Sequence, residues 1–209
     1  MQRALISGAE AGQAAVICLV IHGRGQQPED MVGMITRHID VPGVRYVMPR
    51  APGASWYDAR AIDPLNDRTR VQMGAGLDMI HSLSTEALSA APAAPIVLAG
   101  FSQGACMSAE YLMRHGPLDG GACLFTGCRV GSRADAPPVR SLAGMAVYTS
   151  CGDNDPWIPA PAWHDLIADL TRAGARLRAD LFPGRPHMVT GTEIAALTDM
   201  LAEAAARAR

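Results

Sequence analysis

Residues 100–104, with the sequence Gly-Phe-Ser-Gln-Gly, place a serine between two glycines. An apolar run, Ile96–Phe101, leads into the serine, and a helical pattern, Gln103–Arg114, leads out of it. This strand–turn–helix context is typical of a nucleophile elbow, whose strained turn requires small residues two positions to either side of the serine. Ser102 is therefore the candidate nucleophile. The alternative is a glycine-rich turn in which Ser102 only caps the helix.

Two later loops carry the groups that such a serine needs. A serine hydroxyl is a weak nucleophile, and it requires a base that a carboxylate holds in place. The run Met145–Ser150 leads into a loop with Asp153 and Asp155, and the run Ala179–Phe182 leads into a loop with His187. We predict Asp155 as the acid and His187 as the base, because in such elbows the acid and then the histidine follow later strands. Asp153 is the alternative acid, with Asp155 then only shaping the turn.

A second glycine-flanked turn, His22-Gly23-Arg24-Gly25, ends the apolar run Ala15–Ile21. Acyl transfer needs two donors aimed at the oxygen that becomes negative, and one comes from the residue after the nucleophile, here Gln103. For the second donor we predict the backbone N–H of Arg24. His22 is expected to orient this loop rather than to titrate. An ordinary turn is the alternative, and the glycine pattern is too short for a dinucleotide fingerprint.

Two tryptophans occupy loops beside these segments. Trp56 follows the apolar run Val44–Met48, and Trp157 lies two residues after Asp155. Aromatic side chains in such positions line acyl pockets, so we predict Trp56 and Trp157 as substrate-binding residues, with ordinary core packing as the alternative. The chemistry that these groups support requires no metal and no organic cofactor.

Short apolar runs alternate with longer helical patterns along the whole chain. The strand-like runs are Ala15–Ile21, Val44–Met48, Ile96–Phe101, Ala122–Thr126, Met145–Ser150 and Ala179–Phe182, with a weaker one at Ala4–Ser7. The helical patterns are Asp30–Ile39, Met73–Ala90, Gln103–Arg114, Pro161–Ala173 and Glu193–Ala206. This alternation predicts a doubly wound α/β fold in three layers with a mostly parallel central sheet, built as a single domain over residues 1–209. The aperiodic stretches Arg50–Arg70 and Cys128–Arg140 are expected to be functional covers.

The composition excludes several classes of protein. The chain has 209 residues, of which 49% are hydrophobic and 18% charged, as expected for a globular protein with a full core. The net charge of −2 gives no electrostatic reason to expect nucleic acid as a partner. The longest apolar run, Ala14–Ile21, is too short to span a bilayer. These counts exclude a membrane-spanning protein and a nucleic-acid binder driven by phosphate contacts, and the candidate catalytic groups predict a small-molecule ester as the partner.

The cysteines indicate a reducing compartment. The chain has five of them, an odd number, and no Cys-x-x-Cys pair. Cys18, Cys123 and Cys151 fall inside apolar runs, where a free cysteine behaves as a small buried hydrophobe. The first residues lack the features of a secretory signal, so we expect the protein in the cytoplasm.

In order and spacing these segments resemble the phospholipase/carboxylesterase, or acyl-protein thioesterase, branch of the α/β-hydrolases. The matching segments are His22–Gly25, Pro49–Pro52, Ser55–Tyr57, Gly100–Ala105, Gly152–Pro159 and Pro183–His187. The resemblance implies a compact α/β-hydrolase fold without a large cap domain, and it is compatible with a homodimer. It also implies a triad of Ser102, Asp155 and His187, with Arg24 and Gln103 donating to the oxyanion.

The resemblance implies a serine hydrolase that cleaves small to medium acyl esters through an acyl-enzyme. Arg24 stands where eukaryotic thioesterases tend to carry an apolar residue, and the Arg60–Arg70 loop is charged, so both features favour a small or polar ester. The related dienelactone hydrolases use a cysteine nucleophile, whereas this chain has Ser102 at that position. The alternatives are a thioesterase or lysophospholipase for long acyl chains, and a hydrolase-fold protein that binds a ligand without turnover.

Overall fold

A computed structural model describes residues 3–135 and 139–207. The strands are β1 (Ala4–Gly8), β2 (Val16–Ile21), β3 (Val44–Pro49), β4 (Ile96–Phe101), β5 (Gly121–Phe125), β6 (Ala146–Gly152) and β7 (Arg176–Phe182). The α-helices are α1 (Pro28–Met34), α2 (Asp67–Ala90), α3 (Gln103–His115), α4 (Ala160–Arg172) and α5 (Gly191–Arg207). Short 3-10 turns lie at Ala11–Gln13, Thr36–His38, Pro52–Ala54 and Arg133–Asp135.

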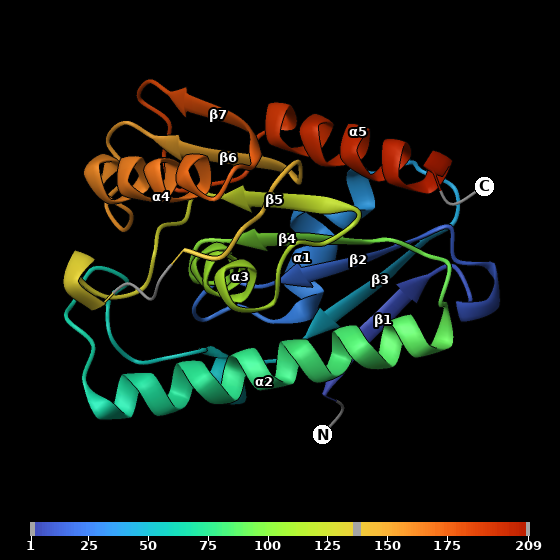
Figure 1. The fold of residues 1–209 in the computed structure, drawn as a ribbon, viewed down its shortest axis with the longest axis horizontal. Helices are drawn as coiled ribbons and strands as arrows, with labels where there is room; N and C mark the ends of the chain where they lie inside the picture. The colour runs from blue at the N-terminus through green and yellow to red at the C-terminus, as the bar shows by residue number, and fades with distance from the viewer. Residues whose placement is uncertain (1–2, 136–138, 208–209) are drawn as a thin grey trace.

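The strands form one seven-stranded sheet in the order β1-β3-β2-β4-β5-β6-β7. β1 pairs antiparallel with β3, and the remaining neighbours are parallel. The carboxyl ends of the parallel strands therefore lie together, at the left edge of the sheet in Figure 1. In doubly wound sheets this edge is where sites form, because loops from several strands meet there.

Helices cover both faces of the sheet, which gives the expected three layers (Figure 1). One core lies between the sheet and α2, α3 and α4, and the other lies between the sheet and α1 and α5. β2 and β4 are buried along their whole length, because they lie in the middle of the sheet with helices on both sides. The three layers and the mostly parallel sheet are as the sequence predicted, and the described residues contain no inserted cap domain.

Three elements have a boundary that differs from the sequence pattern by three residues or more. α2 begins at Asp67 rather than near Met73, because the Asn66 side chain caps it by accepting from the Thr69 N–H at 2.9 Å. α1 is shorter than Asp30–Ile39, since a separate 3-10 turn follows it. β7 begins at Arg176, three residues before the apolar run, because an edge strand accepts polar residues that an apolar pattern does not detect.

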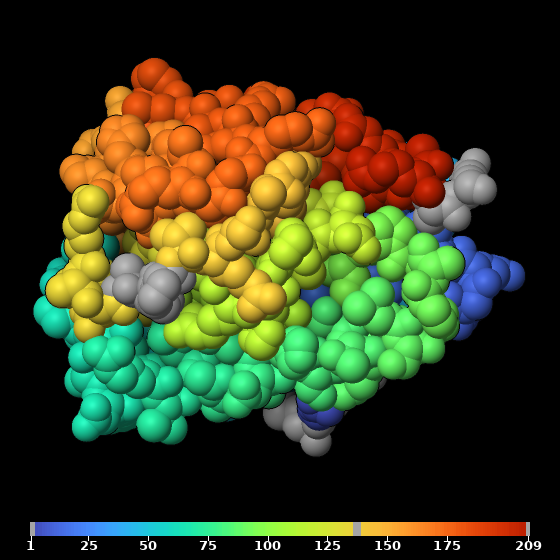
Figure 2. Space-filling view, in the orientation of Figure 1, coloured from blue at the N-terminus to red at the C-terminus, as the bar shows by residue number. Residues whose placement is uncertain are grey.

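The second aperiodic stretch is held against three helices by ion pairs, although its residues 136–138 lie outside the described part of the chain. Arg129 pairs with Glu110 of α3 at 2.7 Å and with Asp169 of α4 at 2.6 Å, and all three side chains are largely buried. Asp135 pairs with Arg70 of α2 at 2.7 Å. Figure 2 shows this segment packed between α4 and the beginning of α2. Removing one partner of such a buried network leaves an uncompensated charge and costs about 3–5 kcal/mol.

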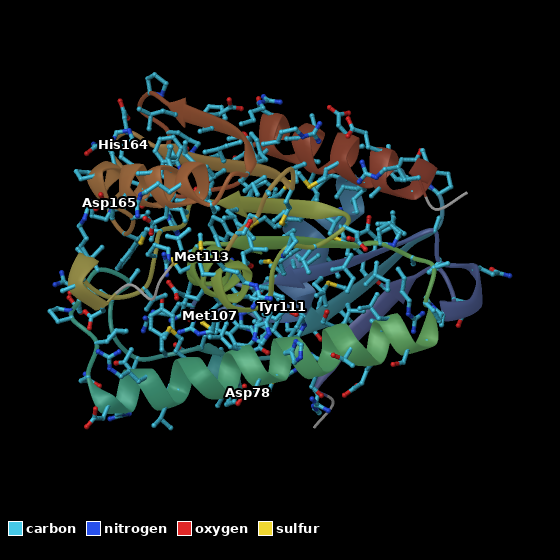
Figure 3. The ribbon with its side chains drawn as sticks, in the orientation of Figure 1. Asp78, Met107, Tyr111, Met113, His164 and Asp165 are labelled. Atoms are coloured by element: carbon cyan, nitrogen blue, oxygen red, sulfur yellow. The ribbon has the colours of Figure 1, made fainter. Side chains whose placement is uncertain are left out.

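α2 packs against α3, the helix that follows the turn at Ser102. In Figure 3, Met107 and Tyr111 lie between these two helices. Both side chains are buried, and a Cβ on Gly76 of α2 would come within 2.9 Å of the Met107 Cε atom. The two helices therefore approach closely at Gly76, and α3 has a fixed position.

Among the described residues, no helix is both long and apolar enough to cross a bilayer.

Candidate active site

Ser102 lies at the turn between β4 and α3, with φ 55° and ψ −122°. Residues other than glycine rarely adopt this backbone conformation. A hydrogen bond to the neighbouring strand stabilises it here, since the Ser102 N–H donates to the Phe125 carbonyl at 3.0 Å. The side chain is partly exposed at the carboxyl edge of the sheet. Strained backbone of this kind clusters at active sites, as the sequence pattern predicted for an elbow.

Each of the two glycines that flank the serine is required for a different steric reason. A Cβ on Gly100 would lie 2.5 Å from the Gly104 carbonyl oxygen, and a Cβ on Gly104 would lie 2.1 Å from the Ile21 carbonyl oxygen. Neither atom belongs to a flexible side chain, so neither clash can relax without moving the backbone. The turn therefore packs against the end of β2, which brings the serine beside the His22–Gly25 loop.

His187, from the loop between β7 and α5, bridges Ser102 and Asp155. Its Nε2 lies 2.8 Å from the Ser102 Oγ, and its Nδ1 lies 2.7 Å from the Asp155 Oδ2. The side chain of His187 is 16% exposed and that of Asp155 is fully enclosed. The structure thus brings together the three residues that the sequence proposed from three separate loops. A hydroxyl, an imidazole and a carboxylate in this order can transfer a proton away from the hydroxyl.

The two candidate acids lie in different positions. The Asp155 Oδ1 accepts from the Trp157 and Ile158 N–H groups, each at 2.8 Å. Burial raises the pKa of the Asp155 carboxyl, but the hydrogen bonds from His187 and these N–H groups outweigh it and hold the pKa below its usual value. Asp153 instead accepts from the Gly184 N–H at 2.8 Å. Asp155 therefore contacts the imidazole, while Asp153 anchors the loop that carries it.

His22 holds the glycine-flanked loop after β2 in place. The His22 Nδ1 lies 2.7 Å from the Gly23 carbonyl oxygen, and its Nε2 accepts from the Ala51 N–H at 3.1 Å. These partners require the proton on Nδ1 and a free lone pair on Nε2, so the ring is neutral. Burial lowers the pKa of His22, although the hydrogen bond to the Gly23 carbonyl opposes this shift. Protonation of Nε2 would place its N–H opposite the Ala51 N–H, so that two donors would face each other.

This contact sets the direction of the Arg24 N–H. In a trans peptide the C=O and the following N–H point in opposite directions, so a Gly23 carbonyl fixed by His22 points the Arg24 N–H away from it. Gly23 lies against Ser102, because a Cβ there would be 3.2 Å from the Ser102 Cβ. Among the described residues, neither the Arg24 nor the Gln103 N–H donates a hydrogen bond. Two free donors thus lie next to Ser102.

The side chain of Gln103 has a role that the sequence did not reveal. Its Oε1 accepts from the Trp56 N–H at 2.9 Å, and its Nε2 donates to the Tyr57 carbonyl at 2.8 Å. The Arg24 guanidinium donates to the carbonyl of Asp58 at 3.0 Å, one residue further along. The side chains of Gln103 and Arg24, the two residues predicted to donate to the oxyanion, thus hold the loop after β3. A polar residue directly after the serine was the only sequence signal for this contact.

The two tryptophans predicted to bind substrate differ in exposure. Trp56 is 2% exposed, and its Nε1 donates to the His22 carbonyl at 2.8 Å. Trp157 is 65% exposed, and Met188, next to His187, is 47% exposed. Trp157 and Met188 therefore present apolar surface in the two loops that carry the acid and the base, whereas Trp56 supports the loop after β2 from within.

Comparisons with known proteins show the family and the fold of the chain. The family model described as Phospholipase/Carboxylesterase matches residues 1–204. An acyl-protein thioesterase 1 from Cryptococcus neoformans is 26% identical over 95% of both chains. Among solved structures, a phospholipase/carboxylesterase from Dyadobacter fermentans superposes with a TM-score of 0.86 at 24% identity, covering 96% of both chains. A carboxylesterase from Mesorhizobium loti superposes with a TM-score of 0.72 at 18% identity, covering 96% of this chain and 99% of that one.

Proposed function

Because the chain belongs to the phospholipase/carboxylesterase family, we propose that this hydrolase cleaves small to medium acyl esters with Ser102 as nucleophile, His187 as base and Asp155 as acid. The observation that carries the proposal is the hydrogen-bonded series from the Ser102 Oγ through both nitrogens of His187 to Asp155, with distances of 2.8 and 2.7 Å. The alternative of a ligand-binding protein without turnover would not require this series.

In the first step, the Ser102 Oγ attacks the acyl carbon while the His187 Nε2 takes its proton. The carbonyl π-electrons move onto oxygen, and the Arg24 and Gln103 N–H groups stabilise the negative charge. The tetrahedral intermediate then collapses, the bond to the leaving alcohol breaks, and His187 returns the proton to the alcohol oxygen. Asp155 stabilises the imidazolium during this step. The product is an acyl-enzyme on Ser102.

In the second step, water replaces the alcohol. His187 takes a proton from the water as its oxygen attacks the acyl carbon, and the bond from the acyl carbon to the Ser102 Oγ breaks. His187 then returns the proton to the Ser102 oxygen, which regenerates the resting enzyme. The original Ser102 proton thus leaves with the alcohol, the regenerated hydroxyl carries a proton from the water, and the rest of the water becomes the OH of the carboxylic acid product.

Ion pairs in the loop before α2 and in the first turn of that helix favour a small or polar acyl group. Arg60 pairs with Asp63 at 2.8 Å, and Arg68 pairs with Asp58 at 2.8 Å. All four side chains are exposed to solvent to some degree, so this loop presents charge rather than a continuous apolar groove. A long acyl chain needs such a groove to recover its hydration free energy, about 0.8 kcal/mol for each buried CH₂.

A chain-length series tests the proposed substrate class. We expect kcat/KM for p-nitrophenyl butyrate to exceed that for the palmitate ester by about tenfold or more, because the extra methylenes find no continuous apolar surface. Steady-state rates on acetate, butyrate, octanoate and palmitate esters measure this preference. A maximum at palmitate would contradict the assignment to short acyl groups.

The second candidate is a thioesterase, because the Cryptococcus neoformans relative is named an acyl-protein thioesterase. The same residues serve a thiol leaving group. A thiol has a lower pKa than an alcohol, so the thiolate can leave with less help from proton transfer by His187. Parallel measurements on a butyryl ester and a butyryl thioester separate the two candidates. A higher kcat/KM on the thioester would favour the thioesterase.

His22 offers a test of the donor geometry. We expect His22→Ala to lower kcat on p-nitrophenyl butyrate by about 10- to 100-fold, because the Gly23 carbonyl loses the contact that aims the Arg24 N–H. His22→Asn is the matched variant, since its side-chain amide keeps a donor near the position of Nδ1. We expect it to recover part of the loss. Equal rates for the two variants would show that the donor to Gly23 does not matter.

A further inference from the structure

One buried carboxylate contacts both ends of the segment that carries His187. Glu193, in the first turn of α5, is fully buried. Its Oε1 lies 2.5 Å from the Arg185 Nη1, two residues before His187. Its Oε2 accepts from the Thr190 N–H at 2.7 Å and from the Thr190 Oγ1 at 2.9 Å, three residues after His187. The imidazole therefore belongs to a short span whose two ends are held by one side chain.

Arg185 extends this connection to the nucleophile. Its Nη2 donates to the Thr126 Oγ1 at 2.6 Å. Thr126 directly follows Phe125, whose carbonyl accepts from the Ser102 N–H at 3.0 Å. Two hydrogen bonds, connected through the covalent link between Phe125 and Thr126, thus join the backbone of Ser102 to the loop that carries His187. This connection fixes the distance between the two reacting groups independently of their own hydrogen bond.

The environment of Arg185 leaves it little freedom to move. The residue is 7% exposed, and its guanidinium lies 5.0 Å from the centre of the Phe182 ring. Its main chain is equally confined, because a Cβ on Gly152 would lie 2.6 Å from the Arg185 carbonyl oxygen. A planar guanidinium with two separate partners holds orientation as well as distance, which an ammonium group does not.

We propose that Arg185 and Glu193 are positioning residues, which hold the imidazole of His187 between Ser102 and Asp155. The proposal rests on the proposed function, since it needs His187 to be the base. A buried ion pair contributes little net stability, because the cost of removing both charges from water offsets their attraction. Its benefit here is orientation, and a displacement of about 1 Å at a reacting group can lower a rate about 100-fold.

The test uses Glu193→Gln and Arg185→Lys in the full chain, with Ser150→Ala as the matched control. Ser150 donates to the same Glu193 carboxylate, but from β6 rather than from the His187 loop. We expect both test variants to lower kcat on p-nitrophenyl butyrate by about 10- to 100-fold, with KM changed less than about twofold. We expect Ser150→Ala to keep kcat within about twofold while lowering the Tm.

A spectroscopic readout separates positioning from loss of stability. The proton between His187 Nδ1 and Asp155 should give a low-field ¹H resonance in the wild type and in Ser150→Ala. It should weaken or vanish in Arg185→Lys and Glu193→Gln at temperatures where near-ultraviolet circular dichroism shows them folded. If Glu193→Gln does not fold, Arg185→Lys, which keeps the charge, decides alone.

The outcomes separate this proposal from the one on which it rests. Wild-type turnover by Ser102→Ala would overturn the proposed function. An inactive Ser102→Ala, together with folded Arg185→Lys and Glu193→Gln variants that keep kcat within about twofold of wild type, would overturn only the positioning role. An equal loss of kcat in Ser150→Ala would also overturn it, because the effect would then follow from general loosening around Glu193.

Discussion

Ser102→Ala is expected to lower kcat on p-nitrophenyl butyrate by about 10⁵- to 10⁶-fold while the protein stays folded. The variant loses the attacking oxygen, whereas the Arg24 and Gln103 N–H groups remain in place. A residual rate above that of water is expected from these donors. Because alanine is smaller than serine and fits the same turn, the Tm should change little.

Labelling by a fluorophosphonate provides the second measurement of this prediction. The reagent phosphonylates an activated serine, so the label should map to the peptide that contains Ser102 and should be absent from Ser102→Ala. Ser108, in the same peptide region, is buried and donates to the Gly104 carbonyl at 2.8 Å, which makes it an internal control. A label on any other serine, or comparable turnover by the two proteins, would reject Ser102 as nucleophile.

Asp155→Asn is expected to lower kcat by about 10⁴-fold. The Asp155 Oδ1 accepts from two backbone N–H groups, so an asparagine would place its carbonyl oxygen there and turn its NH₂ toward His187. Nδ1 would then have to accept, and the ring proton would move to Nε2, where it faces the Ser102 Oγ. An imidazole in that tautomer cannot take the serine proton.

Asp153→Asn is the matched control for this change. Asparagine retains an oxygen that can accept from the Gly184 N–H, so we expect kcat within about threefold of wild type. Rates for both variants on p-nitrophenyl butyrate, with folding checked by circular dichroism, measure the difference. If Asp153→Asn were the more damaging of the two, the choice of Asp155 as the acid would be wrong.

The sequence predicted the fold because its strands carry strong signals. β2 and β4 are apolar at every buried position, and glycines mark the turns that follow them. The same signals led to Ser102, Asp155 and His187, since each follows a recognisable run and the structure places their reactive atoms within 2.8 Å of a neighbour in the series. The order of the loops along the chain was sufficient to predict these three residues, because the loops that follow parallel strands lie at the same edge of the sheet.

Contacts that depend on side-chain direction could not be predicted. Glu193 reads as an ordinary acidic residue in the first turn of a helix, and Arg185 reads as a loop cation. Their pairing requires α5 and the loop after β7 to meet beside the carboxyl end of β5, which no local pattern encodes. The start of α2 was missed for a related reason, since Asn66 caps a first turn rich in charge and poor in apolar residues. A pattern based on apolar periodicity begins only at the first buried turn.

All five cysteines are free and buried. A thiol reagent in solution therefore modifies a given sulfur only when the surrounding structure opens, and the rate of modification measures that opening. Cys106 lies one helical turn after Ser102, where its N–H donates to the Ser102 carbonyl at 3.0 Å, and the Cys128 N–H donates to the Cys106 Sγ at 3.4 Å. Cys18 and Cys123 lie in central strands of the sheet. Modification of Cys106 and Cys128 would thus measure local opening around Ser102, whereas modification of Cys18 and Cys123 would measure global unfolding.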